Sequence, residues 1–495
     1  MVLVDLSADD LPAPRPQRWL NEPRRPVGVA QHPRAYWLAV AAVCIGAFMG
    51  QLDASIVTVA LPTLQRTFHA SLGAVTWVGL SYLIVLVATV TAVGRFADMV
   101  GRKLLYLYGF GVFIVGSTLC GLAPTLGALV GFRAIQAVGA AMLQANSLAI
   151  IMIAVPAERL GRALGIQGAA QAVGLALGPS VGGFLLIAGG WRLIFFVTIP
   201  FGIVGAAVGW LCIPRSRQLQ ERTPFDWRGL GLFFPAVVAL LCAVSFGNSL
   251  GWGSPQIAGL GVVTVLLGFG FVRRERRAVS PMLDLSLFKR ARFSMGIASG
   301  LLSYLVLFGV LFAVPFFFER GLGLASSWSG VELMVMPVAL GLVAPFSGKL
   351  ADRVGPRPLT VLGMALVAGA LCVLAVPELP RPLFLFALAV VGAGLGLFTA
   401  PNNASVMGSV PRQQAGVASG VLNMTRGMGT ALGLACTGLV FGLAGGDAVV
   451  ASAARHAFSI TTLFLALVAL VALTLAALTR NVGATARGAH NNAGE

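Results

Sequence analysis

The stretch GRFADMVG at residues 94–101 returns later in the chain as GKLADRVG at residues 348–355. A second stretch, residues 155–178, returns at residues 410–433 with its proline and most of its glycines in the same places. Both copies lie about 255 residues after their originals. A repeat of this length covers several structural elements, so the sequence predicts two related halves.

The composition places both halves in a membrane. Of 495 residues, 57% are hydrophobic and 10% are charged, which excludes most water-soluble architectures. A membrane-spanning helix needs about 20 apolar residues. The apolar runs predict fourteen such helices, at residues 36–61, 74–96, 104–123, 126–152, 162–187, 191–213, 228–247, 255–272, 293–317, 328–350, 357–376, 382–406, 414–441 and 457–478.

The repeat divides the chain into parts. Six spans with short loops need about 190 residues, so the repeat distance leaves room for one extra helix pair between the halves. We therefore expect an all-α membrane fold with two six-helix bundles and an inserted pair. The expected parts are a disordered, proline-rich cytoplasmic tail at 1–35, an N-terminal bundle at 36–213, a linker with the inserted pair at 214–292, a C-terminal bundle at 293–478 and a second tail at 479–495.

The basic residues indicate the orientation. A net charge of +17 could suggest nucleic acid, but most of the 34 Lys and Arg residues lie in loops on one side of the spans, which is the pattern of membrane topology. With the N-terminus inside, 27 of them are cytoplasmic. The others are five in external loops (Arg66, Arg192, Arg320, Arg381, Arg455) and two within spans (Arg133, Arg426). Both termini are expected in the cytoplasm, with no nucleic-acid partner.

Several kinds of chemistry lack their motifs. The six cysteines stand singly in apolar runs without a nearby histidine, so neither a disulfide framework nor a metal site is expected. The sequence contains no GxxxxGK[ST] phosphate loop and no set of nucleophile, acid and base in a loop. We expect no enzyme activity, no cofactor and no use of ATP. A proton gradient is the expected drive, with sodium as the alternative.

Several motifs together resemble those of one family. Span 1 contains LDASIVTVALP at 52–62, the first repeated stretch continues into Gly101-Arg102-Lys103, and span 5 contains GLALGPSVGG at 174–183. Span 4 has Arg133, followed by a Gln-Ala-Val-Gly run. From Tyr36 to Leu478 the chain resembles the major facilitator superfamily, in particular its fourteen-span drug:proton antiporters of the EmrB/QacA type. Thr58 and Thr198 stand where that family usually has Asn, which weakens inference about the substrate.

A carboxyl group and a guanidinium are expected within the N-terminal bundle. Asp53 lies about 14 Å of helix before Pro62 and so near the bilayer midplane, where an unpaired charge is costly. Protonation of Asp53 that changes with access to the two sides could couple a proton to cargo, and pairing with Arg133 in one state would switch it. The plainer alternative is a fixed structural pair that holds two helices together.

Other polar residues within spans are candidates for the cargo site. Glu332 is expected near the outer end of span 10, as a second proton or cation site or as an interfacial residue that reaches water. Arg426 occupies in span 13 the place that Gln171 has in span 5, and it is expected to face the cavity. The alternative is that it pairs with Glu332 or with helix-end carbonyls. The expected substrate cavity includes Gln136, Gln171, Asn423 and Arg426.

The span 5 motif resembles the gate element of antiporters. Its glycines allow helices to approach closely, and its proline removes a backbone hydrogen bond and kinks the helix. Helix packing alone would also explain the glycines. The expected gate residues are Gly174, Gly178, Pro179, Gly182 and Gly183.

The repeated loop stretch is expected to be a cytoplasmic latch, which is a cluster whose charges pair in one access state and separate in the other. For its cations, a role in topology alone is the alternative. The expected latch residues are Gly94, Asp98, Gly101, Arg102 and Lys103 in the first copy and Gly348, Asp352, Arg353 and Gly355 in the second.

The resemblance implies a proton-coupled antiporter that exports amphipathic, often cationic compounds as a monomer, by rocking one bundle against the other. A dedicated exporter of one endogenous product is the first alternative, and an uptake symporter or a membrane sensor is the second. Arginine outnumbers lysine 31 to 3, which indicates a G+C-rich bacterial source and hence a bacterial cell membrane.

Overall fold

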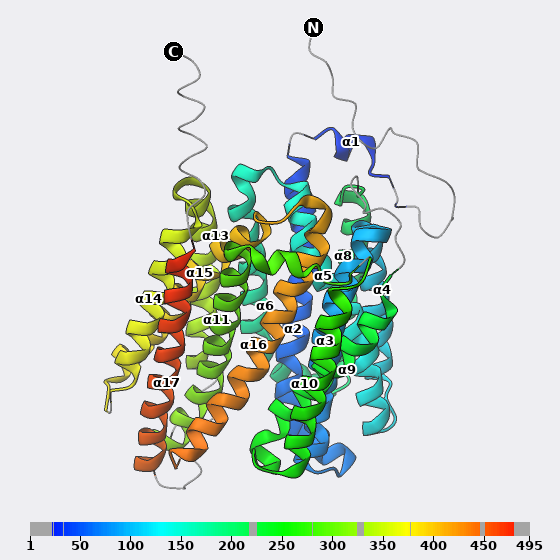
Figure 1. The fold of residues 1–495 in the computed structure, drawn as a ribbon. Coiled ribbons are helices and arrows are strands. Elements are labelled where there is room, and N and C mark those ends of the chain that lie inside the picture. The colour runs from blue at the N-terminus through cyan, green and yellow to red at the C-terminus, as the bar shows by residue number, and fades with distance from the viewer. Residues whose placement is uncertain are drawn as a thin grey trace, which may run out of the picture. The chain divides into compact units, whose positions relative to one another are not determined.

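The computed structural model describes residues 22, 24–32, 34–216, 225–279, 281–323, 331–376, 378–445 and 451–479. Within these ranges every regular element is a helix (Figure 1). Helices dominate because a chain in lipid must satisfy each backbone N–H and C=O internally. Fourteen of the described helices are long and apolar enough to span a membrane, which confirms the predicted fold class.

The long helices follow the predicted spans closely. Their bounds are α2 Ala35–Phe68, α3 Leu72–Val100, α4 Arg102–Gly121, α5 Leu126–Ala154, α6 Leu160–Gly189, α8 Thr198–Cys212, α9 Trp227–Leu250, α10 Pro255–Glu275, α11 Ala291–Phe316, α13 Val335–Val354, α14 Pro356–Leu374, α15 Arg381–Met407, α16 Ala415–Leu443 and α17 Ala451–Leu478. Short helices are α1 Val27–Ala30, α7 Leu193–Phe196, η2 Ala157–Arg159, η3 Leu285–Lys289, η4 Phe317–Gly321 and η5 Arg412–Gln414.

Local chemistry explains where several helices begin. Ser71, Thr125 and Ser254 each precede a helix and accept a hydrogen bond from the backbone N–H three residues later. Asp226 does the same for α9. At Gly101 and Gly355 the chain turns sharply between helices with φ of 126° and 86°, which a glycine adopts without strain. The two copies of the repeated stretch therefore end in the same kind of turn.

The predicted N-terminal tail differs in part from expectation. Residues 1–21 lie outside the described residues, but Val27–Ala30 forms one helical turn after Pro26. Glu22 accepts hydrogen bonds from the backbone N–H of Ser216, at 2.6 Å, and from its hydroxyl, at 2.9 Å. A carboxylate that satisfies loop donors in this way gives order to a segment whose composition predicts none.

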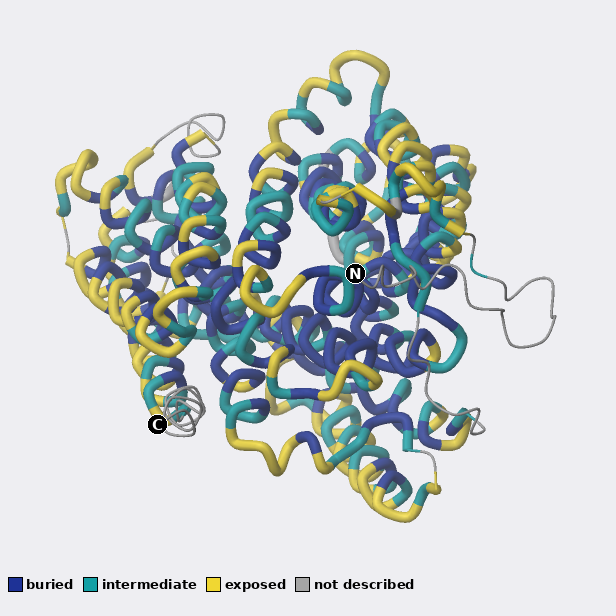
Figure 2. The backbone as a smooth tube through the Cα atoms, turned by 90° about the horizontal axis from the view of Figure 1, so that it is seen from above, coloured by how far each residue is buried: buried dark blue, intermediate teal, exposed yellow. Residues whose placement is uncertain are grey.

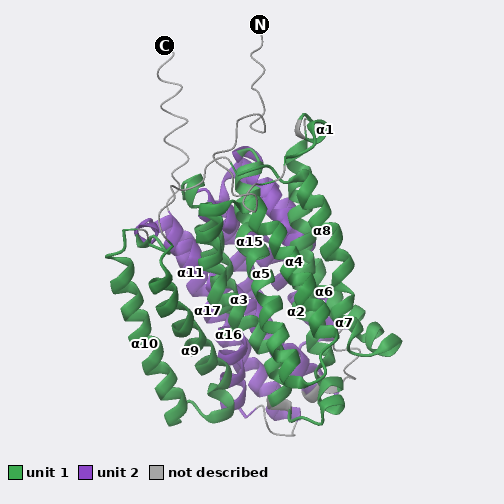
Figure 3. Cartoon of the chain, turned by 90° about the vertical axis from the view of Figure 1, so that its right-hand side faces the viewer, with its two compact units in different colours: residues 1–156, 170–285, 410–431 green, residues 157–169, 286–409, 432–495 purple. Residues whose placement is uncertain are grey.

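The contacts divide the chain into two compact units (Figure 3). Unit 1 contains residues 1–156, 170–285 and 410–431, and unit 2 contains residues 157–169, 286–409 and 432–495. Each unit therefore includes the first part of one helix from the other half of the repeat, since α6 and α16 both divide. This division by contacts differs from the expected parts, in which the N-terminal bundle ends at 213 and the C-terminal bundle begins at 293.

Burial within the units follows helix faces. Buried and exposed residues alternate around the helices (Figure 2). In unit 2, a large apolar core includes Phe318, Leu388 and Phe458. The inserted pair α9 and α10 belongs to unit 1, where α9 packs on α3. Helix α10 exposes Val265, Leu266 and Phe269, as expected of a helix that faces lipid.

Candidate functional site

The predicted pair of opposite charges is present within unit 1. Asp53 lies in the middle of α2 and Arg133 in the second turn of α5, and their exposed fractions are 0% and 1%. Arg133 Nη1 donates to Asp53 Oδ2 at 2.8 Å. Arg133 Nε donates to the backbone carbonyl of Val78 on α3, at 3.1 Å. The ion pair therefore joins three helices of one unit.

Gln136 completes this ion pair. Its Nε2 donates to Asp53 Oδ1 at 2.9 Å, and its Oε1 accepts from Arg133 Nη1 at 2.7 Å. Both carboxylate oxygens of Asp53 are thus hydrogen-bonded. The sequence placed Gln136 in the substrate cavity, whereas the structure places it, fully buried, beside the charged pair. The i, i+3 spacing of Arg133 and Gln136 puts both side chains on one face of α5.

Two hydroxyl groups extend the network, and neither was predicted. Gln136 Nε2 also donates to Ser117 Oγ on α4 at 3.2 Å, and that hydroxyl lies 2.7 Å from Thr198 Oγ1 on α8. The substitution of Thr198 for the family's usual Asn was the one sequence signal in this direction. Ser117 has no motif around it, so only the packing of α4 against α5 reveals its role.

Burial makes these contacts strongly interdependent. A charge taken into an apolar interior is tolerated only when it is paired and its other polar atoms are hydrogen-bonded. Tyr82 packs its ring 4.2 Å from the Arg133 guanidinium, and its own buried hydroxyl has no hydrogen-bond partner among the described residues. A polar molecule that reached this place would find an open acceptor and donor beside the ion pair.

Glu332 pairs with an arginine that the sequence assigned to an external loop. Arg381, the first residue of α15, forms an ion pair with Glu332 Oε1. The carboxylate is 7% exposed and the arginine 52% exposed, and Oε2 of Glu332 is buried without a hydrogen-bond partner among the described residues. Within unit 2, the cation that pairs with Glu332 is thus Arg381, and the suggested pairing with Arg426 stays a prediction.

The other cavity candidates lie in unit 1 on α16 and α6. Arg426 is 8% exposed and donates from Nη1 to Asn423 Oδ1 at 3.1 Å. Asn423 in turn donates to the backbone carbonyl of Gln144 on α5, at 2.8 Å. Gln171 is half-buried on α6, and its side chain makes no hydrogen bond to the described part of the chain. The structure thus joins Arg426 and Asn423 directly but leaves Gln171 apart from them.

Three glycines of the span 5 motif pack α6 against α2. A Cβ atom on Gly174 would lie 2.5 Å from the carbonyl oxygen of Phe48, and one on Gly178 would overlap the Ser55 hydroxyl. One on Gly182 would lie 2.8 Å from a side-chain carbon of Ile56. Ser55 also donates to the Gly174 carbonyl at 3.3 Å. A side chain at Gly174 or Gly178 would therefore displace α2, whereas at Gly182 the Ile56 side chain would have to move.

The last glycine and the proline of the motif differ from the others. A Cβ atom on Gly183 would meet nothing within 4 Å, so this residue takes no part in the close helix contact. Pro179 is exposed and lies inside α6, where it removes one backbone hydrogen bond. The glycines that contact α2 and the exposed Pro179 therefore lie on different faces of α6.

The first latch stretch holds the start of α16 within unit 1. Asp98 accepts hydrogen bonds from the N–H groups of Gly416, at 2.8 Å, and Val417, at 3.0 Å. Arg102 donates to Asp98 at 2.8 Å and also to the backbone carbonyl of Arg412, at 2.9 Å. Asp98 and Arg102 are both buried. A carboxylate at the N-terminus of a helix is favourable, because the helix end carries partial positive charge.

The second latch stretch repeats this arrangement within unit 2. Asp352 accepts from the N–H groups of Gly161, at 2.7 Å, and Arg162, at 2.9 Å, at the start of α6. In both copies two glycines bring the backbones together, Gly94 with Gly416 and Gly348 with Gly161.

The copies differ in their cations. Pro356 stands where the first copy has Arg102, so Asp352 has no arginine in that place. Arg353 is exposed, while Lys103 is buried. The equivalence of the two copies thus lies in the aspartates and glycines rather than in the basic residues.

The described residues form fourteen membrane-length helices that carry buried polar networks, as in a multi-pass membrane protein. The chain belongs to the major facilitator superfamily. The family model described as Major Facilitator Superfamily matches residues 43–434 and 297–492. The members and structural neighbours of this family that match the chain are membrane transporters rather than enzymes.

Similar proteins have various named cargoes. The chain is 33% identical to the riboflavin transporter RibZ of Clostridioides difficile, over 81% of this chain and 87% of that protein. It is 34% identical to the multidrug resistance protein Stp of Mycobacterium tuberculosis, over 82% and 76%. The crystal structure of the human organic anion transporter MFSD10 matches with a TM-score of 0.67 at 15% identity, over 90% of this chain and all of that one, which is a likeness of fold.

Proposed function

We propose that the protein is a proton-coupled antiporter that exports amphipathic, partly cationic compounds across a bacterial cell membrane. The observation that carries the proposal is Asp53, a carboxylate buried in the middle of an apolar helix and held by Arg133 and Gln136. A carboxylate at this depth costs free energy to bury, so its presence favours a functional role. The simplest ion that the Asp53 carboxylate could bind in place of its contacts with Arg133 and Gln136 is a proton.

The proposed cycle exchanges one contact for another. In this structure Asp53 forms an ion pair with Arg133. Protonation of Asp53 would cancel its charge and release Arg133 and Gln136 to other partners. If these side chains then change the cargo site, binding of a proton and binding of cargo would exclude each other. One charge that crosses about 100 mV supplies roughly 2.3 kcal/mol, which is enough for a concentration ratio of about fiftyfold.

The latches and the glycine face of α6 would convert this local change into alternate access. The latch aspartates bind helix N-termini through two hydrogen bonds each, contacts that can break and form again as a set. The close contact of α6 with α2 provides a smooth surface along which helices can shift. Both termini would lie in the cytoplasm, on the side with most of the basic residues.

The named relatives favour two ranges of cargo. Stp is named as a multidrug resistance protein, which favours broad export. RibZ is named as a riboflavin transporter, which favours a dedicated carrier of one compound as the second candidate. The two candidates share the proton step at Asp53 and differ in the cargo site.

Transport by the purified protein in lipid vesicles tests the proton step. With an imposed pH gradient, the parent protein should drive ethidium against its concentration gradient, and Asp53→Asn should lose this transport because the amide cannot titrate. Glu378→Gln, which changes an exposed carboxylate outside the long helices, is the matched control and should retain it. Gradient-driven transport by Asp53→Asn at the parent rate would overturn the proposal.

A growth panel separates the two cargo ranges. In an exporter-deficient host, expression of a broad exporter should raise resistance to several unrelated toxic compounds, and Asp53→Asn should abolish each gain. Protection against one compound only, also lost in Asp53→Asn, would establish the dedicated carrier instead.

A further inference from the structure

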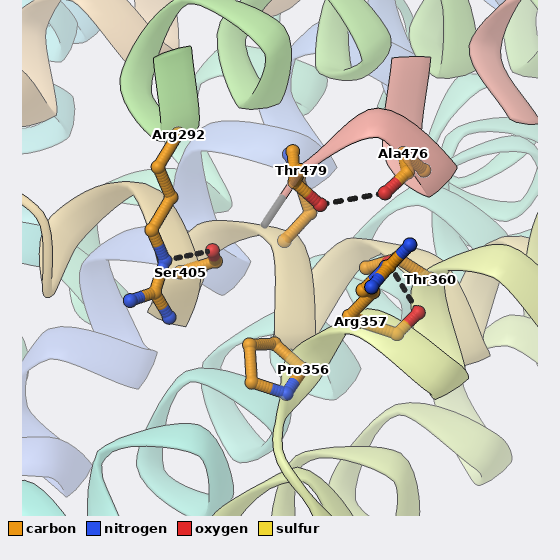
Figure 4. Close-up of a pocket in the computed structure, with 8 residues that line it drawn as sticks. Arg292, Pro356, Arg357, Thr360, Ser405, Ala476 and Thr479 are labelled. Atoms are coloured by element: carbon orange, nitrogen blue, oxygen red, sulfur yellow. Dashed lines mark hydrogen bonds between the residues drawn. The ribbon is translucent and has the colours of Figure 1, made fainter. Parts of the chain in front are cut away.

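A basic pocket lies within unit 2, away from the buried networks described above. It is partly open to solvent, and its lining residues are Arg292, Pro356, Arg357, Thr360, Asn402, Ser405, Ala476 and Thr479 (Figure 4). The lining contains two guanidinium groups, an amide and three hydroxyl groups, and it contains no carboxylate. Nothing in the proposed transport cycle uses this pocket.

Four helix ends form the pocket at one level. Arg292 is the second residue of α11, and Pro356 and Arg357 are the first two residues of α14. Ser405 lies in the last turn of α15, and Ala476 lies in the last turn of α17. Since these four helices are membrane spans, the pocket lies where the spans begin or end. This is the depth at which the headgroups of a bilayer lie.

The hydrogen bonds leave most of the guanidinium donors open. Arg292 Nε donates to Ser405 Oγ at 2.8 Å, and Arg357 Nη2 donates to the backbone carbonyl of Ala477 at 2.6 Å. These bonds orient the two side chains. The Nη groups of Arg292, and Nε and Nη1 of Arg357, have no partner among the described residues, where neither arginine forms an ion pair.

The remaining polar side chains of the lining either donate a hydrogen bond to a backbone carbonyl or keep a hydroxyl proton to donate. Thr360, Asn402 and Thr479 donate to backbone carbonyls, at 2.9, 3.0 and 2.6 Å. Ser405 accepts from Arg292, so its own hydroxyl proton is available to another acceptor. The prolines at 356 and 358 remove N–H groups from the start of α14, so the positive charge of the pocket comes from its side chains.

We propose that this pocket binds a phosphate group, supplied by the headgroup of an anionic phospholipid or by a soluble phosphate. Two oriented guanidinium groups with open, forked donors are the usual partners of phosphate oxygens, which accept several hydrogen bonds at once. A half-buried arginine without a counter-ion is costly, and a bound phosphate would supply the missing negative charge. Basic pockets between membrane helices at headgroup depth bind phospholipids in this way.

Binding to the full-length protein tests the site. After the detergent-solubilised protein is stripped of lipid, phosphatidylglycerol should raise its melting temperature, and native mass spectrometry should detect the bound lipid. Arg292→Gln with Arg357→Gln should lower the bound fraction about tenfold, as the loss of two charge-assisted contacts predicts. Arg277→Gln, which removes an exposed arginine in unit 1, should change it less than about twofold.

The arms of the test distinguish the two sources. Phosphatidylglycerol that stabilises the parent while inorganic phosphate at equal ionic strength does not would assign a lipid headgroup, and the reverse result would assign a soluble phosphate. Arg357→Gln alone, at an exposed residue, serves if the double variant does not fold and should also reduce binding. Binding of both ligands that is equal in the parent, Arg357→Gln and Arg277→Gln would overturn the proposal.

Discussion

At the scale of single residues, Asp53, Arg133 and Gln136 form one interdependent hydrogen-bonded group. Each carboxylate oxygen of Asp53 has a donor, and Arg133 reaches both the carboxylate and the amide. Removal of one partner from a buried ion pair leaves the other charge without compensation, at a cost of about 3–5 kcal/mol. The consequences of changing these residues are therefore linked.

A double-mutant cycle on Asp53 and Arg133 measures this link. Asp53→Asn and Arg133→Gln should each abolish gradient-driven transport and lower the melting temperature, because each strands a buried partner. The double variant should lose little more than Asp53→Asn alone, since the pair is already broken. Melting curves and vesicle transport check both statements, and strictly additive losses would show that the two residues act independently.

At the scale of elements, the contact of α6 with α2 depends on atoms that a side chain would displace. Gly178 should not tolerate substitution, because its Cβ position coincides with the Ser55 hydroxyl. Gly178→Leu should stop transport while the protein still inserts in the membrane, whereas Gly183→Leu, on the same helix but facing open space, should transport normally. Vesicle transport compares the two, and equal activity would refute the packing argument.

The two latches predict unequal costs for the same substitution. Asp98 is buried with Arg102, so Asp98→Asn strands a buried guanidinium and should cost about 3 kcal/mol of stability. Asp352 is half-buried and has no arginine in the equivalent place. It loses backbone hydrogen bonds and an attraction to the exposed Arg162, which solvent screens, so Asp352→Asn should cost about 1–2 kcal/mol. Thermal unfolding in detergent ranks the two variants, and the opposite ranking would contradict the structural difference between the copies.

At the scale of the whole molecule, the charge bias predicts the orientation in the membrane. Cysteine accessibility tests it in a background without the six native cysteines. Arg277→Cys follows α10 on the expected cytoplasmic side, and Gly445→Cys follows α16 on the expected external side. A membrane-impermeant maleimide should label Gly445→Cys in intact cells and Arg277→Cys only after permeabilisation. The reverse pattern would invert the topology and the direction of transport.

The sequence by itself determined the spans and the repeat. Lipid imposes the same length and polarity on each helix separately, so local composition suffices to find it. The first span was predicted at 36–61 and is observed at 35–61. The last was predicted from residue 457 and begins at 451, because the helix continues through polar residues that need no lipid.

Only the tertiary structure decided which polar groups meet. Asp53 and Arg133 could be paired from the sequence, because few charges lie within the spans of the first half. Ser117 and Thr198 join them, and Arg381 meets Glu332, only because packing sets the rotation of each helix. The basic pocket needs the ends of four helices from separate parts of the chain. Such contacts depend on how closely and at what rotation neighbouring helices pack. That packing is set by pairs of helices together, so the sequence of one segment does not reveal it.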